Sequence, residues 1–339
     1  MTSLNDLLCN LLLSGVELSI EDGKLRVRAP DGALAPDTLD TLRRNKEELL
    51  RLLPQLRVDA PLSIGQEGLW AIYQSAPESS AYNVGVALHI ESETEQGPVL
   101  RRALQKLLNR HPLLRTTYTH RDGALHQAVS GYSEVKLQEI DASRDRWDEV
   151  VSAAAAVVRR PFALAEEGGF RACLFRRGPR ESVLLLCVHH IAIDGWSFRR
   201  LLDELMSLYG ADGRANPLPP VKHTYHEFVR IQRDTLAARG EELRRAWAEE
   251  LKDAPLVLDL PVDHARPSVQ TFGGRTLLRT LDPSLVGSLR TLARAPPSRI
   301  RRRLHHARRH HDHAAREASA PGAGAKPQRG PRQREDCQR

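Results

Sequence analysis

Residues 183–197 limit most strongly what this chain can fold into. The stretch opens with six apolar residues, enough for one strand buried on both faces, and ends in two histidines, His189 and His190. Apolar residues then recur at helical spacing over residues 198–210, and Ser197 is the expected N-cap. The pattern predicts a strand, a tight loop and a helix, with titratable groups where the strand stops.

The residues at this junction allow several chemistries. Successive side chains of a strand point to opposite faces, so His189 and His190 cannot serve one site equally. One is expected to support the loop, and the other to project into a cleft, where a neutral imidazole can accept a proton. Asp194 can orient a ring or pair with an arginine, and Gly195 lets the backbone approach closely. Structural histidines remain an open alternative at this point. Zinc needs three or four ligands, and His190 and Asp194 alone are suitably spaced, so we expect no metal.

The motif resembles a known signature. His189-His190-x-x-x-Asp194-Gly195, followed by Trp196-Ser197, is similar to the active-site motif of nonribosomal peptide synthetase condensation domains, which belong to the chloramphenicol-acetyltransferase-like acyltransferases. Three further motifs occur in family order: Ser63, Gln66, Leu69 and Trp70 in a Ser-x-x-Gln-x-x-Leu-Trp pattern; Arg110-His111-Pro112-Leu113-Leu114-Arg115-Thr116, with proline where the family commonly has glutamate; and Tyr225-His226-Glu227-Phe228, with glutamate in place of aspartate.

This resemblance implies a reaction and a role for each residue. An acceptor amine on one carrier protein attacks a donor thioester on another, with no covalent enzyme intermediate. His190 is then the expected general base, and the Gly195 N–H is a candidate oxyanion donor. The resemblance pairs Asp194 with an arginine of a second lobe and gives His189 a supporting role. We expect Arg115 to be structural, at the start of its strand.

The resemblance also implies an α/β fold, built of α+β layers, with two similar lobes. Residues 61–293 are expected to hold the first lobe and the start of the second. The remaining expected elements are a helix after Ser63, a strand over 82–90, a helix from Pro98, a hairpin turning at 122–123, a helix over 145–158, a hairpin of 170–175 with 183–188, and a helix over 227–251.

Residues 1–54 read as a separate small domain. Ser3 caps a leucine-rich helix, residues 16–29 alternate as a hairpin, and Pro36 opens a second helix. This helix-hairpin-helix order resembles the N-terminal docking domains of the tubulysin-synthetase type, which bind an upstream synthetase subunit. Exposed Lys24, Arg26 and Arg28 would attract an acidic partner segment. We expect residues 55–60 to be a linker.

The basic charge of the chain is confined to its C-terminal end. Residues 294–339 contain thirteen Arg and Lys against four Asp and Glu, a net charge of +9, so the remaining residues carry −2 of the total of +7. This segment has too few apolar residues to fold and is expected to be disordered. Three explanations stay open for it: an out-of-frame reading of a GC-rich gene, which we favour, a genuine truncation, or a basic nucleic-acid-binding arm.

Cysteine use and the lack of export signals favour a cytoplasmic protein. The four cysteines form no CxxC pair, and neither a signal peptide nor a membrane span is expected. We expect no bound cofactor, because the resemblance places phosphopantetheine on partner carrier proteins. The expected partners are the upstream subunit and the donor and acceptor carriers, without nucleic acid or membrane. Two alternatives remain open: a catalytically inactive docking protein, and a stand-alone acyltransferase with a hydroxyl acceptor.

Overall fold

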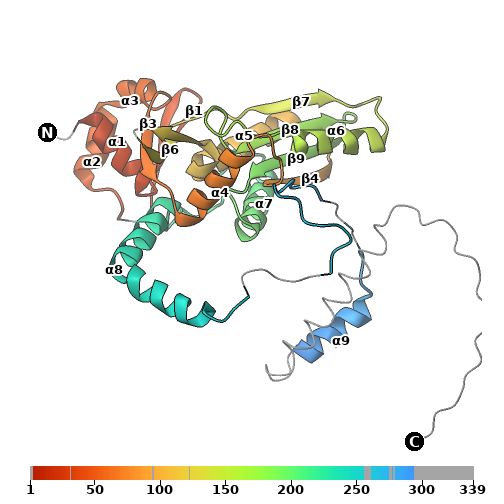
Figure 1. Cartoon of the computed structure of the whole chain (residues 1–339). Helices are drawn as coiled ribbons and strands as arrows, with labels where there is room; N and C mark the ends of the chain where they lie inside the picture. The colour runs from red at the N-terminus through yellow and green to blue at the C-terminus, as the bar shows by residue number, and fades with distance from the viewer. Residues whose placement is uncertain are drawn as a thin grey trace, which may run out of the picture. The chain divides into compact units, whose positions relative to one another are not determined.

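The computed structural model describes residues 3–30, 32–93, 95–121, 123–255, 261–274, 277 and 279–293. The chain divides into two compact units, Met1–Phe272 and Gly273–Arg339, and helix α9 (Pro283–Ala293) belongs to the second. Figure 1 traces the helices and strands. The basic segment 294–339 lies outside the described residues, so its expected disorder stays a prediction.

The N-terminal part contains the expected helix and hairpin, followed by two short helices. Its elements are α1 (Leu4–Leu13), β1 (Glu17–Glu21), β2 (Lys24–Arg28), α2 (Pro36–Arg44) and α3 (Lys46–Leu52). Ser3 caps α1 in a capping box with Asp6, as its position predicts. Asp22 and Gly23 have positive φ angles of 51° and 68°, which suit a tight hairpin turn. The second predicted helix is divided at Asn45, where φ is −103° and ψ is 20°.

Most of residues 55–60, which we expected to be a linker, belong to a strand of a sheet. Arg57–Pro61 forms strand β3, which pairs antiparallel with β6 (Ala124–Ser130). Val58 of β3 packs with Leu12 of α1 and Val129 of β6. The alternating burial of this short strand was not read from the sequence because Pro54 and Pro61 bracket it. The N-terminal part is therefore packed against the sheet that follows it.

Two sheets and their covering helices make up the rest of the first unit. Besides β3 and β6, its elements are α4 (Ile64–Ser75), β4 (Asn83–Glu91), α5 (Gln96–Arg110), the 3₁₀ turn η1 (Pro112–Arg115), β5 (Thr116–Arg121), β7 (Leu137–Asp141), α6 (Trp147–Arg159), β8 (Phe170–Arg176), β9 (Glu181–His189), α7 (Gly195–Gly210) and α8 (Tyr225–Leu251). One sheet has the strand order β3-β6-β5 and the other β4-β9-β8-β7. The expected mixture of helices and sheets is confirmed.

Strand β9 runs through the centre of its sheet, buried on both faces. It pairs antiparallel with β4 and β8. Leu184 and Leu186 belong to the main apolar cluster, which includes residues of α5 and α7, whereas Val183 and Leu185 pack in a cluster with residues of α6. This division follows from the alternation of side chains along a strand. As predicted, the apolar run is a core strand that ends at the histidines.

Helix α8 has little buried surface. It begins at Tyr225, close to the predicted start, and Thr224 caps it by accepting a hydrogen bond from the Glu227 N–H. Among the described residues of this helix, Val229 alone is buried. Its exposed large apolar side chains are Phe228, Ile231, Leu236, Trp247 and Leu251.

A buried ion pair attaches α7 to α5. The Arg110 Nε donates to Oε2 of Glu204 at 3.1 Å, and the His111 ring lies 2.5 Å from the same oxygen. Both Arg110 and Glu204 are nearly inaccessible to solvent. Burial alone would raise the pKa of Glu204, but His111 and Arg110 outweigh it and lower this pKa to about 2. The Arg-His motif thus has a structural partner on the helix that follows the histidine pair.

We expect Glu204→Gln to lower the free energy of unfolding by about 2–4 kcal/mol at pH 7, because it leaves Arg110 buried without a counter-charge. In the wild type, the carboxylate protonates near pH 4.5 when unfolded and near pH 2 when folded. The stability that the Glu204 carboxylate contributes is therefore fully present above about pH 4.5 and is lost as the pH falls towards 2. Urea denaturation should show that the difference in free energy of unfolding between wild type and variant becomes smaller as the pH falls from about 4.5 to about 2.

Glu67→Gln is the matched control, because Glu67 pairs with Arg233 at the surface. Glu67→Gln should lower the free energy of unfolding by less than about 1 kcal/mol. If both variants lowered it equally, the buried pair would stabilise the fold no more than a surface pair does.

Candidate active site

His189 lies inside the core at the end of β9. Its imidazole is packed among the rings of Tyr73, Tyr82 and Phe162, with centroids 6.0–6.4 Å away. Its Nδ1 accepts a hydrogen bond from the Ile191 N–H at 3.1 Å, so the neutral ring carries its proton on Nε2. Burial lowers the pKa of His189 to about 4, and the charge of His190 acts in the same direction. His189 therefore stays neutral at pH 7 and holds the turn of the loop.

His190 is exposed to solvent, in contrast to its neighbour. Its backbone N–H donates to the carbonyl of Tyr82 at 2.8 Å, which fixes the main chain where the strand stops. The rings of Tyr82 and His190 meet edge to face, 6.4 Å apart. In the described part of the chain no hydrogen bond to a ring nitrogen of His190 is seen. Its imidazole is accessible to an incoming group.

Asp194 caps helix α7. Its Oδ1 accepts a hydrogen bond from the Ser197 N–H at 2.8 Å, and this bond lowers the pKa of the Asp194 carboxyl. The prediction that Ser197 is the N-cap is therefore wrong, because the helix begins at Gly195. Apart from its chain neighbours and its own helix, no described residue has an atom within 4 Å of the place where a Cβ on Gly195 would stand. The Gly195 N–H is one of the donors that a helix leaves unpaired at its first turn. Trp196 beside it is 86% exposed.

The opening motif holds the loop from the other side. Gln66 Nε2 donates to the carbonyl of Ile191 at 3.1 Å, while Gln66 also forms a capping box with Ser63. The Ser63 hydroxyl lies 2.7 Å from the hydroxyl of Tyr225. Three sequence motifs thus meet at one place. Their spacing predicted the cap of α4, but the loop contact of Gln66 was missed because it spans 125 residues.

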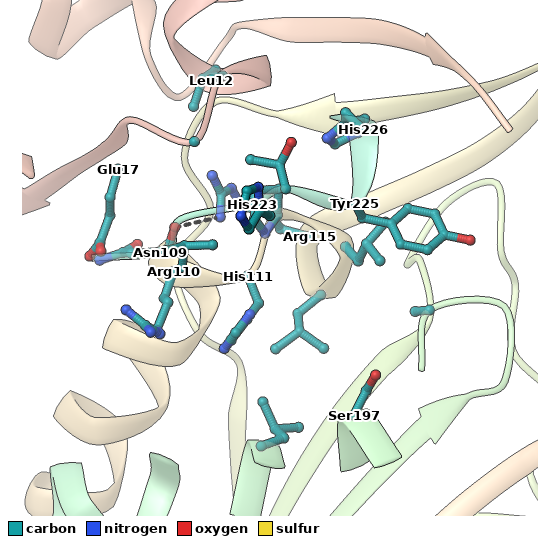
Figure 2. Close-up of a pocket in the computed structure, with 18 of the residues that line it drawn as sticks. Leu12, Glu17, Asn109, Arg110, His111, Arg115, Ser197, His223, Tyr225 and His226 are labelled. Atoms are coloured by element: carbon teal, nitrogen blue, oxygen red, sulfur yellow. Dashed lines mark hydrogen bonds between the residues drawn. The ribbon is translucent and has the colours of Figure 1, made fainter. Parts of the chain in front are cut away.

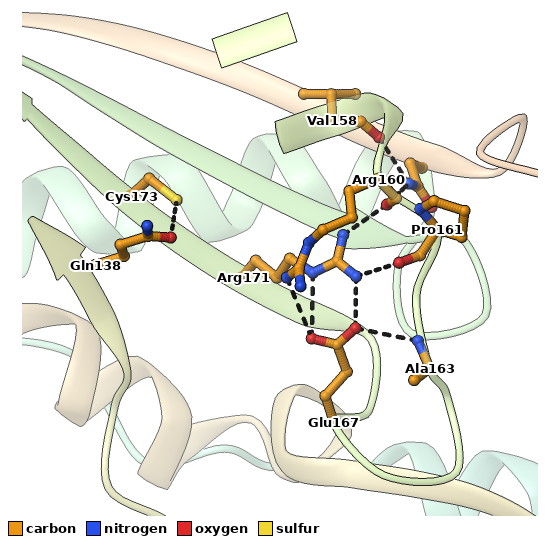
Figure 3. A network of polar contacts seen from close by, with 9 residues as sticks. Gln138, Val158, Arg160, Pro161, Ala163, Glu167, Arg171 and Cys173 are labelled. Carbon is orange, nitrogen blue, oxygen red and sulfur yellow. Dashed lines mark hydrogen bonds and ion pairs between the residues drawn. The ribbon is translucent and has the colours of Figure 1, made fainter. Parts of the chain in front are cut away.

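A second network fixes the support of His189 (Figure 3). Arg171 donates to the Glu167 carboxylate at 3.2 Å and to the Arg160 carbonyl at 2.6 Å. Its guanidinium also lies 3.7 Å from the centre of the Phe162 ring. Phe162 in turn contacts His189. The loop between α6 and β8 is thereby held in place behind the histidine pair.

Arg115 has the structural role that we expected. Its guanidinium is buried and donates to the carbonyl groups of Ser130 at 2.8 Å, Asn109 at 3.0 Å and Leu108. These bonds join the end of α5 to the sheet. Burial lowers the pKa of Arg115 to about 10, which still leaves it charged at neutral pH.

A cavity of about 230 Å³ lies behind the loop, bordered by Ala192, Ile193 and Ser197 (Figure 2). His190 does not line it. In the described residues no group of three or more His, Cys, Asp or Glu side chains is placed to hold a metal ion. None of the described helices is long and apolar enough to cross a membrane.

Comparison with protein families identifies both parts of the chain. Residues 57–304 match the family described as Condensation domain, and residues 4–55 match the TubC N-terminal docking domain. The chain therefore belongs to the condensation-domain family. The resemblance drawn from the His189–Gly195 motif and from the N-terminal elements is confirmed.

Curated relatives agree with this family. The chain is 34% identical over 243 residues to the dimodular nonribosomal peptide synthase of Bacillus subtilis (strain 168), a match that covers 69% of this chain and 10% of that protein. It is 33% identical over 241 residues to the phosphinothricin tripeptide synthetase PhsB of Streptomyces viridochromogenes, and this match covers 69% of this chain and 20% of that protein. The chain thus spans a small part of the length of these relatives.

Solved structures share the fold. A four-domain nonribosomal peptide synthetase bound to AMP and glycine aligns with a TM-score of 0.61 at 24% identity, over 69% of this chain and 18% of that one. The first condensation domain of the calcium-dependent antibiotic synthetase, in complex with a substrate analogue, aligns with a TM-score of 0.50 at 27% identity. That match covers 58% of this chain and 48% of the other.

We expect the imidazole of His189 to titrate near pH 4. The unfolded ring binds a proton near pH 6.5, so the stability that this group contributes is complete above about pH 6.5 and lost as the pH falls to 4. The loss is on the order of 3 kcal/mol. NMR of the imidazole carbon-bound protons would check this, and a midpoint near 6.5 would show that the ring is solvated.

Gly168→Ala should destabilise the loop behind His189 by about 2 kcal/mol or more. Gly168 has a φ of +73°, and an added Cβ would lie 2.6 Å from the carbonyl oxygen of Thr116. Gly178→Ala is the control, since its Cβ would meet no atom of the described residues within 4 Å apart from its two chain neighbours. Thermal unfolding of the two variants provides the measurement; equal midpoints would mean that the loop adapts at no cost.

Proposed function

We propose that this chain supplies the condensation domain of a nonribosomal peptide synthetase, forming an amide bond between two carrier-bound substrates. The condensation-domain family is acyltransferase-like. The observation that carries the proposal is the position of His190, whose exposed imidazole stands where buried β9 ends and α7 begins. His189, with its ring bonded to the loop, supports that position instead of taking part in proton transfer.

The proposed step transfers an acyl group from sulfur to nitrogen. The acceptor amine attacks the thioester carbonyl, so that a C–N bond forms and the C–S bond breaks. His190 takes the proton from the amine and returns it to the departing thiolate. The Gly195 N–H at the start of α7 is the proposed donor to the oxyanion, helped by the positive end of the helix dipole. Asp194 acts indirectly, by capping this helix.

The proposed partners follow from the two family matches. Carrier proteins of nonribosomal peptide synthetases bear phosphopantetheine, and we propose that this chain binds no cofactor of its own. The docking domain is proposed to bind an upstream subunit, with the domains divided as residues 1–54 and 61–293. Lys24 and Arg26 remain exposed on the hairpin for an acidic partner, whereas Arg28 turns inward and donates to the Leu218 carbonyl. We place the protein in the cytoplasm, in line with the free thiols of Cys9, Cys173 and Cys187.

A second candidate function is that of a docking protein that binds a partner but catalyses no reaction. Phe228 and Ile231, one turn apart on α8, are both exposed in the described part of the chain and support this candidate, because a second polypeptide would cover such an apolar surface. Purified chain that binds an upstream tail peptide but forms no product with loaded carriers would support this candidate.

His190→Ala should lower the rate of condensation by about 10²–10⁴-fold, because the amine loses its proton acceptor. The assay mixes the purified chain with amine-loaded and hydroxyl-loaded carriers and detects products by mass spectrometry. Product with hydroxyl-loaded carriers alone would favour a stand-alone acyltransferase instead.

The matched control is His120→Ala, which removes an exposed histidine from β5 of the other sheet and should leave the rate unchanged. If His190→Ala were as active as this control, His190 would not be the base.

A further inference from the structure

The cavity behind the motif loop joins the docking domain to the condensation domain. The turn after α1 and the end of β2 form one wall, and the end of α5, the start of α7 and the start of α8 form the others. Figure 2 shows Glu17, Asn109, Arg115 and His226 around this space. Because His190 does not line it, the cavity is separate from the proposed reaction site.

Three residues that line it each carry a buried polar atom without a hydrogen-bond partner among the described residues: Arg28 Nη1, Asn109 Nδ2 and His226 Nε2. Asn109 is only 2% exposed. Its Oδ1 accepts a hydrogen bond from Gln105 Nε2 at 3.0 Å, so its amide nitrogen remains as a donor. Buried donors are nearly always satisfied in folded proteins, because an unpaired one costs about 1–3 kcal/mol. Two such donors in residues around one cavity, together with a His226 nitrogen that donates in one of its tautomers, therefore indicate a missing acceptor.

The charges on the walls indicate the sign of that acceptor. Among the described residues, four arginines line the cavity, against Glu17 as the one lining carboxylate. Arg110 and Arg200 are paired with Glu204, which lies beside the cavity. Arg28 and Arg115 make their hydrogen bonds to backbone carbonyls, which carry no net charge. The walls therefore retain an excess of positive charge.

The acidic residue on the wall agrees with this picture. Glu17 lies opposite Arg28 in the hairpin register, but no ion pair between them is seen in the described structure. Burial raises the pKa of Glu17 in spite of Arg28, Arg110 and Arg115 nearby. Even when ionised, Glu17 and Glu204 together offset only two of the four arginines, and the Glu17 carboxylate would repel a bound anion.

We infer that this cavity binds a small dianion with carboxylate or phosphate oxygens, held by Arg28, Asn109 and His226. Its oxygens would accept from the guanidinium and the amide, and from His226 in the tautomer that carries a proton on Nε2. A volume of about 230 Å³ is several times the roughly 30 Å³ that one water molecule occupies, so a dianion with some water fits.

The bound anion would also fasten the two domains together. Arg28 belongs to the docking domain, whereas Asn109 and His226 belong to the condensation domain. Besides the bond from Arg28 to the Leu218 carbonyl, two further contacts cross the same boundary: Lys106 pairs with Glu21 at 3.2 Å, and the Thr224 hydroxyl donates to the Leu13 carbonyl at 3.1 Å. Anion binding should therefore raise the stability of the whole chain, since the separated domains would lack the site.

Isothermal titration calorimetry of the full chain tests the inference, with inorganic phosphate and malonate as separate probes and chloride at matched ionic strength as the reference. We expect at least one probe to bind one-to-one with a Kd below about 1 mM and to raise the urea midpoint. The preferred probe tells whether tetrahedral or planar oxygens fit better. Binding of neither probe would overturn the inference.

Matched variants test the residues. Arg28→Gln should weaken binding by about tenfold or more, because it removes a charged donor. Arg26→Gln changes the same charge on the same strand, on an exposed side chain, and should alter binding by less than about twofold. Equal affinities of these two variants would show that the anion binds elsewhere.

Two further substitutions keep the test valid if loss of Arg28 disturbs folding. Glu17→Gln should tighten binding, because it removes a repelling carboxylate and adds a donor. Asn109→Asp should weaken it, since a second carboxylate replaces the free amide nitrogen while an oxygen remains for Gln105. Unchanged affinity in both variants would contradict the assigned site.

Discussion

The structure depends on the burial of β9 on both faces. A strand covered in this way can present reactive side chains only where it leaves the core, and β9 leaves it between His189 and His190. The hydrogen bond from the Ile191 N–H to His189 Nδ1 turns the chain at that point. One step along the backbone therefore separates a neutral, buried imidazole from an accessible one.

Side chains from the other motifs of the family stabilise this turn. Gln66 binds the Ile191 carbonyl, Ser63 meets Tyr225, and Arg110 pairs with Glu204 on α7. None of these three contacts joins neighbours in the sequence. Motifs that are far apart along the chain are thus parts of one framework around the loop, which positions the start of α7 relative to His190.

Much of the local structure was predictable from the residues. Capping by Ser3 and Ser63, the hairpin at Asp22 and Gly23, and the apolar run of β9 follow from interactions within a few residues. The errors have a common origin. Asp194 rather than Ser197 caps α7, since both types cap well and only the observed loop conformation selects between them. Arg57–Pro61 is a strand because β6 lies beside it, which no local pattern reveals.

The sequence by itself determined the family, the order of the elements and the pair of histidines from which the site is built. Those properties depend on periodicity and on residue types at short spacing. Only the tertiary structure decided which histidine is buried, which residues brace the loop, and that Arg28 turns from the docking hairpin towards the condensation domain. These outcomes depend on solvent exclusion and on partners 94 to 190 residues away in the sequence, so no local pattern can specify them.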